Sequence, residues 1–185
     1  MISPRLARAL FIPSLLGEAA TALVTSRRWW DRIDDVVILG ALPTTWHVAQ
    51  LHDLGVRRVI NLCNEYAGPR AAYARHGIEQ LRLPTPDFSP PTLDAVQRAL
   101  ALIDEAAAAQ ESVYLHCKAG RGRSATVAVC RLMQTNPISA EAAEARLRAI
   151  RPHIDRHLHR RPVVSAFART LCDSTPNVSL TVEPL

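Results

Sequence analysis

Short runs of strand-forming residues alternate with helical segments from Asp31 onward, and this alternation constrains the fold more than any other feature of the chain. The strand-like runs cover residues 36–40, 58–62, 78–83 and 112–116. Because a helical segment lies between successive runs, the strands are expected to form one central sheet with helices on its faces. The sequence therefore predicts an α/β fold with a central sheet of four to five strands.

The helices are marked by apolar residues that recur every three or four positions. The clearest helix follows Ser89-Pro90-Pro91, where a capping residue and early prolines are typical of a helix start. The stretch from Arg123 to Met133 is apolar almost all round, so we expect a central helix that is covered on several sides. Ser139 is expected to cap the next helix, which Arg151-Pro152 ends, and a last helix is predicted from Pro162 to Leu171.

The composition is that of a globular protein, with 48% apolar and 21% charged residues in a chain of 185, and it excludes collagen, a coiled coil and a disulfide scaffold. The four cysteines are widely spaced and form no Cys-x-x-Cys pair, so we expect no zinc site and a reducing compartment. The net charge of +5 comes without a basic helix, so we expect no nucleic-acid partner.

The pattern divides the chain into residues 1–30, 31–172 and 173–185. Residues 1–30 are apolar and bear arginines, and we expect this segment to lie close to a membrane. An organelle transit peptide, a weak secretory signal and a helix packed on its own domain are the alternatives. Residues 31–172 form the predicted catalytic domain, and residues 173–185 contain two prolines and are expected to be a loosely held tail.

The most informative segment runs from His116 to Ser124, between a predicted strand and a predicted buried helix. Cys117 and Arg123 enclose five residues, which is the spacing found in cysteine-dependent phosphatases. A loop of this length, relaxed by glycines, can turn its backbone N–H groups inward as an anion site, and the helix that follows adds its positive end. We therefore expect Cys117 to be the nucleophile and Arg123 to clamp phosphate oxygens.

The other residues of this loop have predicted roles as well. Ser124 is expected to donate a hydrogen bond to the cysteine thiolate, and His116 is expected to order the loop without titrating. The substrate phosphate should be bound by the residues between the cysteine and the arginine, which are Lys118, Ala119, Gly120, Arg121 and Gly122. Lys118 is the only lysine among 22 basic residues, so a compact ammonium group at this position is expected to matter.

Transfer of a phosphoryl group to sulfur needs an acid that protonates the departing oxygen. Asp87 follows a predicted strand in a proline-rich loop, where a positioned carboxyl group could serve as this acid. Asp94 is the rival, although its place within a predicted helix makes it the weaker candidate. The alternative is that Asp87 has a structural role and caps a turn.

The chain resembles the mitochondrial-type protein tyrosine phosphatases, which are dual-specificity-type enzymes that dephosphorylate phosphatidylglycerophosphate and have plant and bacterial relatives. The resemblance covers residues 6 to about 167, and it is clearest at Trp29-Trp30-Asp31, Leu39 to Pro43, Gly77 to Leu83 and Cys117 to Ser124. It implies a dual-specificity phosphatase fold, with Cys117 as nucleophile, Arg123 as phosphate clamp and Asp87 as general acid.

Two stretches depart from the pattern of this family. The segment Asn61 to Tyr66 differs from the usual order of acidic residues and tyrosine, which leaves the roles of Glu65 and Tyr66 open. The segment from His153 to Arg161 is richer in histidine and arginine than in the relatives. His153 and His157 have a spacing that could bind a metal, but the surrounding arginines favour a solvated basic patch.

These observations favour a lipid phosphomonoesterase that acts on phosphatidylglycerophosphate through a phosphocysteine, without cofactor or metal. A dual-specificity protein phosphatase, a phosphoinositide phosphatase and a catalytically silent phosphate-binding module are the alternatives. The expected partners are a phospholipid substrate and a membrane surface, and we expect a monomer. The expected location is a membrane that faces a reducing compartment, either the bacterial cytoplasm or the mitochondrial matrix.

Overall fold

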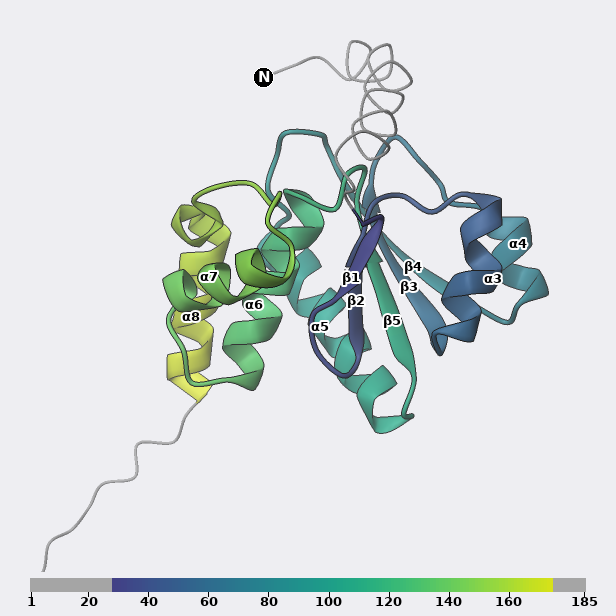
Figure 1. The fold of residues 1–185 in the computed structure, drawn as a ribbon. Coiled ribbons are helices and arrows are strands. Elements are labelled where there is room, and N and C mark those ends of the chain that lie inside the picture. Colours follow the sequence, from purple (N-terminus) through teal and green to yellow (C-terminus); the bar gives the residue numbers. More distant parts are fainter. Residues whose placement is uncertain (1–27, 175–185) are drawn as a thin grey trace, which may run out of the picture.

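A computed structural model describes residues 28–174, which form a five-stranded sheet with helices on both faces (Figure 1). The strands lie in the order β1-β2-β5-β3-β4. Their bounds are Trp30–Arg32 for β1, Val37–Gly40 for β2, Val56–Cys63 for β3, Glu79–Thr85 for β4 and Ser112–His116 for β5. The α/β fold that the alternation predicts is confirmed.

Four strands run parallel, so their carboxyl ends meet at one edge of the sheet. β5 pairs in parallel with β2 and β3, and β3 pairs in parallel with β4. The edge strand β1 is antiparallel to β2, with Asp31 opposite Leu39, and its three residues were not among the predicted strands. β1 is too short to show an alternating pattern, and its position depends on pairing with β2.

The helices form two layers around the sheet (Figure 1). α3 (Thr45–Asp53) and α4 (Arg70–Arg75) pack on one face through buried residues such as Val48 and Tyr73. The other face is covered by α5 (Leu93–Ala108) and α6 (Arg123–Thr135). The helices α7 (Ala140–Ile150) and α8 (Pro162–Ser174) and a short 3₁₀ helix, η1 (Leu158–Arg160), pack mainly on α6. Both layers remove apolar side chains from water, and this burial stabilises the sheet.

α5 begins after Ser89-Pro90-Pro91 as predicted, but its cap is Thr92 and not a residue of that segment, whereas α7 has the predicted cap, Ser139. Thr92 caps α5 by accepting a hydrogen bond from the Ala95 N–H at 3.2 Å, and Ser139 caps α7 by accepting one from the Ala142 N–H at 3.2 Å. Every residue of α6 from Arg123 to Met133 is buried, as the nearly uniform apolar pattern predicts. The beginning of α6 is therefore fixed in the middle of the protein, directly after β5.

The predictions for the two ends of the chain fall mainly on residues outside the described range of 28–174. At the boundaries, β1 begins at Trp30 and α8 extends to Ser174, so Asp173 and Ser174 are helical and do not belong to the tail.

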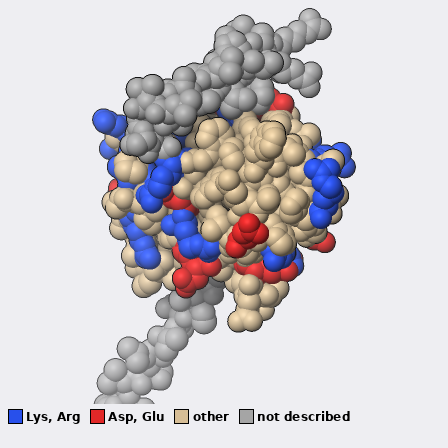
Figure 2. Space-filling model, turned by 45° about the vertical axis from the view of Figure 1, so that its right-hand side comes forward, with Lys and Arg blue, Asp and Glu red and all other residues tan. Residues whose placement is uncertain are grey.

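Among residues 28–174, no helix has the length and apolarity needed to cross a membrane. Seen from the side of α3 and α4, the surface has a broad uncharged area with basic side chains along two of its margins (Figure 2).

Candidate active site

The segment Cys117 to Gly122 forms a loop at the carboxyl edge of the sheet, between β5 and α6. All five residues of β5 are buried, and α6 is buried from its first turn, so both ends of the loop are fixed by the core. Cys117 lies at the start of the loop and is only 3% exposed. The loop therefore presents the cysteine at the positive end of a buried helix.

The surroundings of Cys117 favour a thiolate. Burial opposes ionisation, but the Arg123 guanidinium, the Ser124 hydroxyl and the backbone N–H groups of Ser124 and Arg121 outweigh it and lower the pKa of the Cys117 thiol. The Ser124 hydroxyl donates a hydrogen bond to Cys117 Sγ at 3.2 Å. Ser124 is thus in the predicted position.

Arg123 is held by a carboxylate that comes from the end of β3. Its Nη1 and Nη2 atoms donate to the two carboxylate oxygens of Glu65 at 2.9 and 2.7 Å, and Nη1 also donates to the Thr85 carbonyl at 2.9 Å. Burial raises the pKa of Glu65, but the hydrogen bonds and charge of Arg123 outweigh burial and lower it. Glu65 therefore fixes the plane of the guanidinium, a role that the sequence left open.

Tyr66 and Asn61 hold this carboxylate in place. The Tyr66 hydroxyl donates to the Pro43 carbonyl at 2.7 Å, and the Asn61 side-chain amide donates to the Tyr66 carbonyl at 2.9 Å. These bonds join the segment after β3 to the segment after β2, and both segments border the catalytic loop. Tyr66 therefore positions the neighbouring Glu65.

The structure brings Asp87 to the catalytic loop and leaves Asp94 away from it. Asp87 Oδ1 lies 2.9 Å from Arg123 Nη2, and Asp87 Oδ2 lies 3.9 Å from Lys118 Nζ. The Asp94 side chain is 76% exposed on α5, where it pairs with Arg98 at 3.7 Å. The geometry therefore favours Asp87 as the acid.

His116 lies behind the loop and is completely buried. Its Nδ1 atom is 3.1 Å from the Cys117 carbonyl oxygen, which can accept a hydrogen bond from it. Burial, and to a smaller extent the charge of Arg123, lower the pKa of His116 to about 4 against the opposing effect of that hydrogen bond. His116 is therefore neutral near pH 7 and orders the loop, as predicted.

Arg151 binds the outer side of the loop, a role that the sequence did not reveal. Its guanidinium is 1% exposed and donates to the carbonyl oxygens of Gly120 at 3.0 Å and Ala119 at 3.2 Å. Its Nη1 atom also pairs with Asp31 of β1 at 2.6 Å. Because Arg151 binds these carbonyl groups on the outside, the loop N–H groups can face inward.

The segment after β2 supports the same loop. Leu42 donates its N–H to the Lys118 carbonyl at 3.0 Å. Gly120 has a φ of 66°, and a Cβ there would lie 2.4 Å from the Gly40 carbonyl oxygen, so only glycine fits this close approach. Gly40 in turn makes room for Tyr114, because a Cβ at Gly40 would lie 2.1 Å from the Tyr114 hydroxyl oxygen.

The segment after α7 closes the far side of the loop at Gly122. Arg161 Nη1 donates to the Gly122 carbonyl at 3.1 Å, and Arg161 Nη2 pairs with Asp155 at 3.2 Å. A Cβ at Gly122 would lie 2.5 Å from Asp155 Oδ2. This part of the histidine- and arginine-rich segment thus packs directly against the phosphate-binding loop.

His153 and His157 do not share a metal-binding cluster. Within residues 28–174 there is no group of three or more histidine, cysteine, aspartate or glutamate side chains placed to hold an ion. His157 has a φ of 63°, and its N–H donates to Glu144 at 3.0 Å. Arg156 and Arg160 are exposed, which agrees with the interpretation of a solvated basic patch.

The catalytic loop opens into a pocket of about 260 Å³. Cys117 and Arg123 lie in its lining together with Asp87. The remaining predicted phosphate-binding residues that line it are Lys118, Ala119, Arg121 and Gly122, and Gly120 is not among the lining residues. Gly120 instead faces Gly40 and Arg151, so its contribution is to the shape of the loop.

Comparison with known proteins agrees with this geometry. The family profile described as "Dual specificity phosphatase, catalytic domain" matches residues 37–168. The chain is 38% identical over 167 residues to phosphatidylglycerophosphate phosphatase PTPMT2 of Arabidopsis thaliana, covering 88% of this chain and 73% of the relative. It is 38% identical over 164 residues to human phosphatidylglycerophosphatase and protein-tyrosine phosphatase 1, covering 83% and 82% of the two chains.

Solved structures with the same fold include the crystal structure of PTPMT1. It aligns with a TM-score of 0.72 at 35% identity and covers 78% of this chain and 97% of that one. The structure of PTPMT1 in complex with PI(5)P aligns with a TM-score of 0.72 at 31% identity, covering 80% and 100% of the two chains. One conclusion follows from the buried cysteine in a phosphate-binding loop, from the arginine clamp and from this similarity over most of the chain. The chain belongs to the dual-specificity phosphatase family and is a cysteine-dependent phosphomonoesterase.

Proposed function

We propose that the protein hydrolyses the phosphomonoester of phosphatidylglycerophosphate, with Cys117 as nucleophile, Arg123 as phosphate clamp and Asp87 as general acid. This assignment would place it in the synthesis of phosphatidylglycerol and cardiolipin. The alternative is a dual-specificity phosphatase for phosphorylated proteins or phosphoinositides. The charge of the catalytic pocket is the observation on which the choice of a lipid substrate rests.

The first chemical step transfers the phosphoryl group to sulfur. The Cys117 thiolate attacks phosphorus, a sulfur–phosphorus bond forms, and the bond from phosphorus to the leaving oxygen breaks. Asp87 donates its proton to that oxygen, so the product leaves as an alcohol. Loop N–H groups and Arg123 bind the phosphoryl oxygens throughout this step, and Glu65 holds the clamp in the required plane.

The second step releases phosphate. A water molecule attacks phosphorus and gives its proton to Asp87, which became a carboxylate in the first step. The sulfur–phosphorus bond breaks as the new oxygen–phosphorus bond forms, and the sulfur leaves as a thiolate. Ser124 lies 3.2 Å from Cys117 Sγ, where its hydroxyl can stabilise the departing thiolate.

The pocket lining supports a polyanionic lipid headgroup over phosphotyrosine. Four basic side chains line it, namely Lys118, Arg121, Arg123 and Arg161, together with the carboxylates of Asp87 and Asp155. The aromatic side chain in the described lining is Phe88, which is 80% exposed at the rim. A phosphotyrosine ring gains most from aromatic walls in a deep pocket, whereas a lipid with two phosphates gains from additional positive charge.

The relatives support the same substrate class. The Arabidopsis thaliana and human relatives are both named for phosphatidylglycerophosphate, and the human protein is also named a protein-tyrosine phosphatase. PTPMT1 has been crystallised with a phosphoinositide, PI(5)P. A lipid substrate also agrees with an exposed aromatic residue, Phe88, beside the pocket, because aromatic side chains favour the membrane interface.

The proposed location follows from the proposed substrate. A lipid phosphatase acts at a membrane surface, and a catalytic thiolate needs a reducing compartment to stay unoxidised. We therefore propose that the protein associates with a membrane facing the bacterial cytoplasm or the mitochondrial matrix. The apolar, arginine-bearing segment of residues 1–30 is the proposed membrane-proximal part of the chain.

A phosphate-release assay tests the proposed function. The full-length protein is compared on vesicles that contain phosphatidylglycerophosphate, vesicles that contain phosphoinositides, and soluble phosphotyrosine and phosphothreonine peptides. We expect the kcat/KM for phosphatidylglycerophosphate to exceed the others by about tenfold or more. The Cys117→Ser variant controls for contaminating phosphatases. A higher kcat/KM for the peptides would contradict the lipid assignment and support the protein phosphatase.

A further inference from the structure

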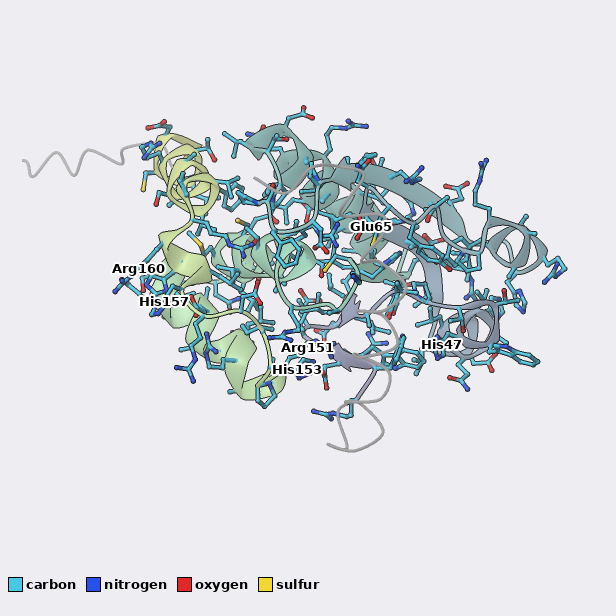
Figure 3. The ribbon with its side chains drawn as sticks, turned by 90° about the horizontal axis from the view of Figure 1, so that it is seen from above. His47, Glu65, Arg151, His153, His157 and Arg160 are labelled. Atoms are coloured by element: carbon cyan, nitrogen blue, oxygen red, sulfur yellow. The ribbon has the colours of Figure 1, made fainter. Side chains whose placement is uncertain are left out.

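A second hollow adjoins the catalytic pocket, on the side of α7 and α8. This groove has a volume of about 990 Å³ and lies along the segment from Pro152 to Arg161. Arg121, Asp155 and Arg161 line both the groove and the catalytic pocket, so the two are continuous across these side chains. In Figure 3, which looks down on the molecule from above the view in Figure 1, Arg151 lies near the middle and His157 and Arg160 lie to the left, on the side of α7 and α8.

The groove has an excess of positive charge. Its lining includes four arginines, namely Arg121, Arg148, Arg156 and Arg161, and two histidines. The carboxylates in the same lining are Glu144 and Asp155. Because arginine keeps its charge at every physiological pH, the groove stays net positive whatever the protonation of the histidines. A concave surface of one charge concentrates ions of the opposite charge.

Glu144 is committed to the structure of the groove wall. It accepts hydrogen bonds from the N–H groups of His157 and His159 at 3.0 and 2.9 Å, from His159 Nδ1 at 2.6 Å and from Arg148. Burial opposes its ionisation, but the hydrogen bonds from His159 and Arg148 outweigh burial and lower the pKa of Glu144 to about 2. Glu144 is therefore ionised and binds the 3₁₀ segment to α7, and the paired guanidinium of Arg148 offsets its charge toward an anion in the groove.

Asp155 and Arg161 connect the groove to the catalytic loop. They pair with each other, and both contact Gly122, the last residue before α6. Arg156 follows Asp155 and is exposed within the groove lining. An anion beside Arg156 would thus be separated from the scissile phosphate only by the side chains that the two hollows share.

We infer that this groove binds a second phosphate group, in addition to the one that is hydrolysed, and that Arg156 is a specificity-determining residue for it. The chemistry required is a phosphodiester or phosphate anion held by charge-assisted hydrogen bonds from guanidinium groups. In phosphatidylglycerophosphate, the phosphodiester beside the scissile monoester provides this group, so the inference rests on the proposed function for the identity of its ligand. A neighbouring anionic lipid could supply the same chemistry.

Binding to a trapped protein tests this inference without requiring lipid hydrolysis. The full-length Cys117→Ser variant is titrated with glycerol 3-phosphate, which has one phosphate, and with the soluble deacylated headgroup of phosphatidylglycerophosphate, which has a monoester and a diester. We expect the second probe to bind about tenfold more tightly, since an added charge-assisted contact contributes roughly this factor. Adding Arg156→Gln to the Cys117→Ser variant should remove most of the difference in affinity between the two probes. A higher salt concentration should also reduce this difference.

Arg160→Gln, also in the Cys117→Ser background, is the matched control. Arg160 is exposed, lies four residues from Arg156 and is not part of the groove lining, so its variant has the same net charge without the proposed contact. Vesicles with phosphatidylglycerol in place of the soluble headgroup form a second arm. If Arg156→Gln weakens binding of the soluble headgroup, the groove binds the phosphodiester of the substrate itself. If Arg156→Gln weakens only the binding to vesicles, the groove binds the phosphate of a neighbouring lipid.

The inference is overturned if Arg156→Gln and Arg160→Gln have equal effects in both arms, because the contribution would then be general charge attraction. It is also overturned if the two-phosphate headgroup binds no more tightly than glycerol 3-phosphate and vesicle binding does not depend on Arg156. These results differ from a failure of the proposed function. In that case the protein would not hydrolyse phosphatidylglycerophosphate in vesicles, while its preference for two phosphates could still be measured.

Discussion

The loop that contains Cys117 and the loop that contains Asp87 meet in one pocket but are held in very different ways. The cysteine loop is enclosed by buried elements, and Arg151, Leu42 and Arg161 bind its carbonyl groups from outside. Asp87 faces the site through ion pairs with Arg123 and Lys118, and the next residue, Phe88, has a φ of 61° and is 80% exposed. The nucleophile is thus built into the core, whereas the acid depends on charges that belong to the other loop.

This difference separates two kinds of mutational effect. A change beneath the cysteine loop should reduce both folding stability and activity, because the loop shares its contacts with the core. A change in the acid loop should affect the chemistry with little effect on folding. The following experiments test that contrast, from the largest expected effect to the smallest.

Cys117→Ser should have the largest effect on activity. A serine hydroxyl in the same loop is far harder to ionise than a thiol, so no covalent intermediate should form and activity should fall by roughly 10⁴-fold or more. Phosphate should still bind, because the N–H groups and Arg123 are unchanged. Turnover with an aryl phosphate and phosphate binding by calorimetry measure the two properties. Substantial residual turnover would contradict the covalent mechanism.

Arg151→Met should destabilise the protein through the cysteine loop. The change leaves buried Asp31 with the exposed Arg28, 2.7 Å away, as a charged partner, and it removes the hydrogen bonds to Gly120 and Ala119. Breaking a buried ion pair costs about 3–5 kcal/mol. The free energy of unfolding is measured in urea. Arg146→Met, at an exposed position of α7, is the control.

The double variant Arg151→Met with Asp31→Leu separates positioning from stability. Replacement of both charges by apolar groups should restore much of the unfolding free energy, while the loop carbonyls remain without their donor. We therefore expect kcat to stay low in the double variant even where it is folded. Recovery of kcat together with stability would show that Arg151 acts on folding alone.

Asp87→Asn should reduce activity without a comparable loss of stability. An amide cannot protonate the leaving oxygen, so kcat on a lipid alkyl phosphate should fall by roughly 100-fold. An aryl phosphate should lose less, because its leaving group needs less protonation. Asp94→Asn, at an exposed position of α5, is the matched control. Equal losses of kcat on both substrates would show that another group protonates the leaving oxygen.

Ser124→Ala should have the smallest effect, a shift in pH dependence. Ser124 helps to lower the pKa of Cys117 by donating to the thiolate, so its removal should raise that pKa. The thiolate is the reactive form, and its fraction falls as pH decreases through the pKa. The midpoint of iodoacetamide alkylation and the acidic limb of kcat/KM should therefore both move to higher pH. An unchanged midpoint would show that Arg123 and the backbone N–H groups suffice.

The sequence by itself determined the features that depend on neighbouring residues. The strand before Cys117, the spacing to Arg123 and the apolar helix after it are local in the chain, and together they predict an anion-binding loop. Asp87 was predicted from its place in a stiff loop after a strand, and the structure puts it 2.9 Å from Arg123. The succession of β2, β3, β4 and β5 along the chain follows from the same local alternation, and so does the α/β fold.

Only the tertiary structure decided which distant charges hold these parts together. No local pattern in the sequence assigns a partner to Glu65, Arg151 or Asp31. The sheet order brings the segments of Glu65 and Asp31 beside the cysteine loop, and the packing of α7 on α6 brings Arg151 there. The three-residue strand β1 has no periodic pattern, so its pairing with β2 depends on that same packing. The cationic groove likewise requires α7, the segment that follows it and the catalytic loop to meet. Local patterns specify the elements, whereas the burial of side chains between elements specifies their contacts.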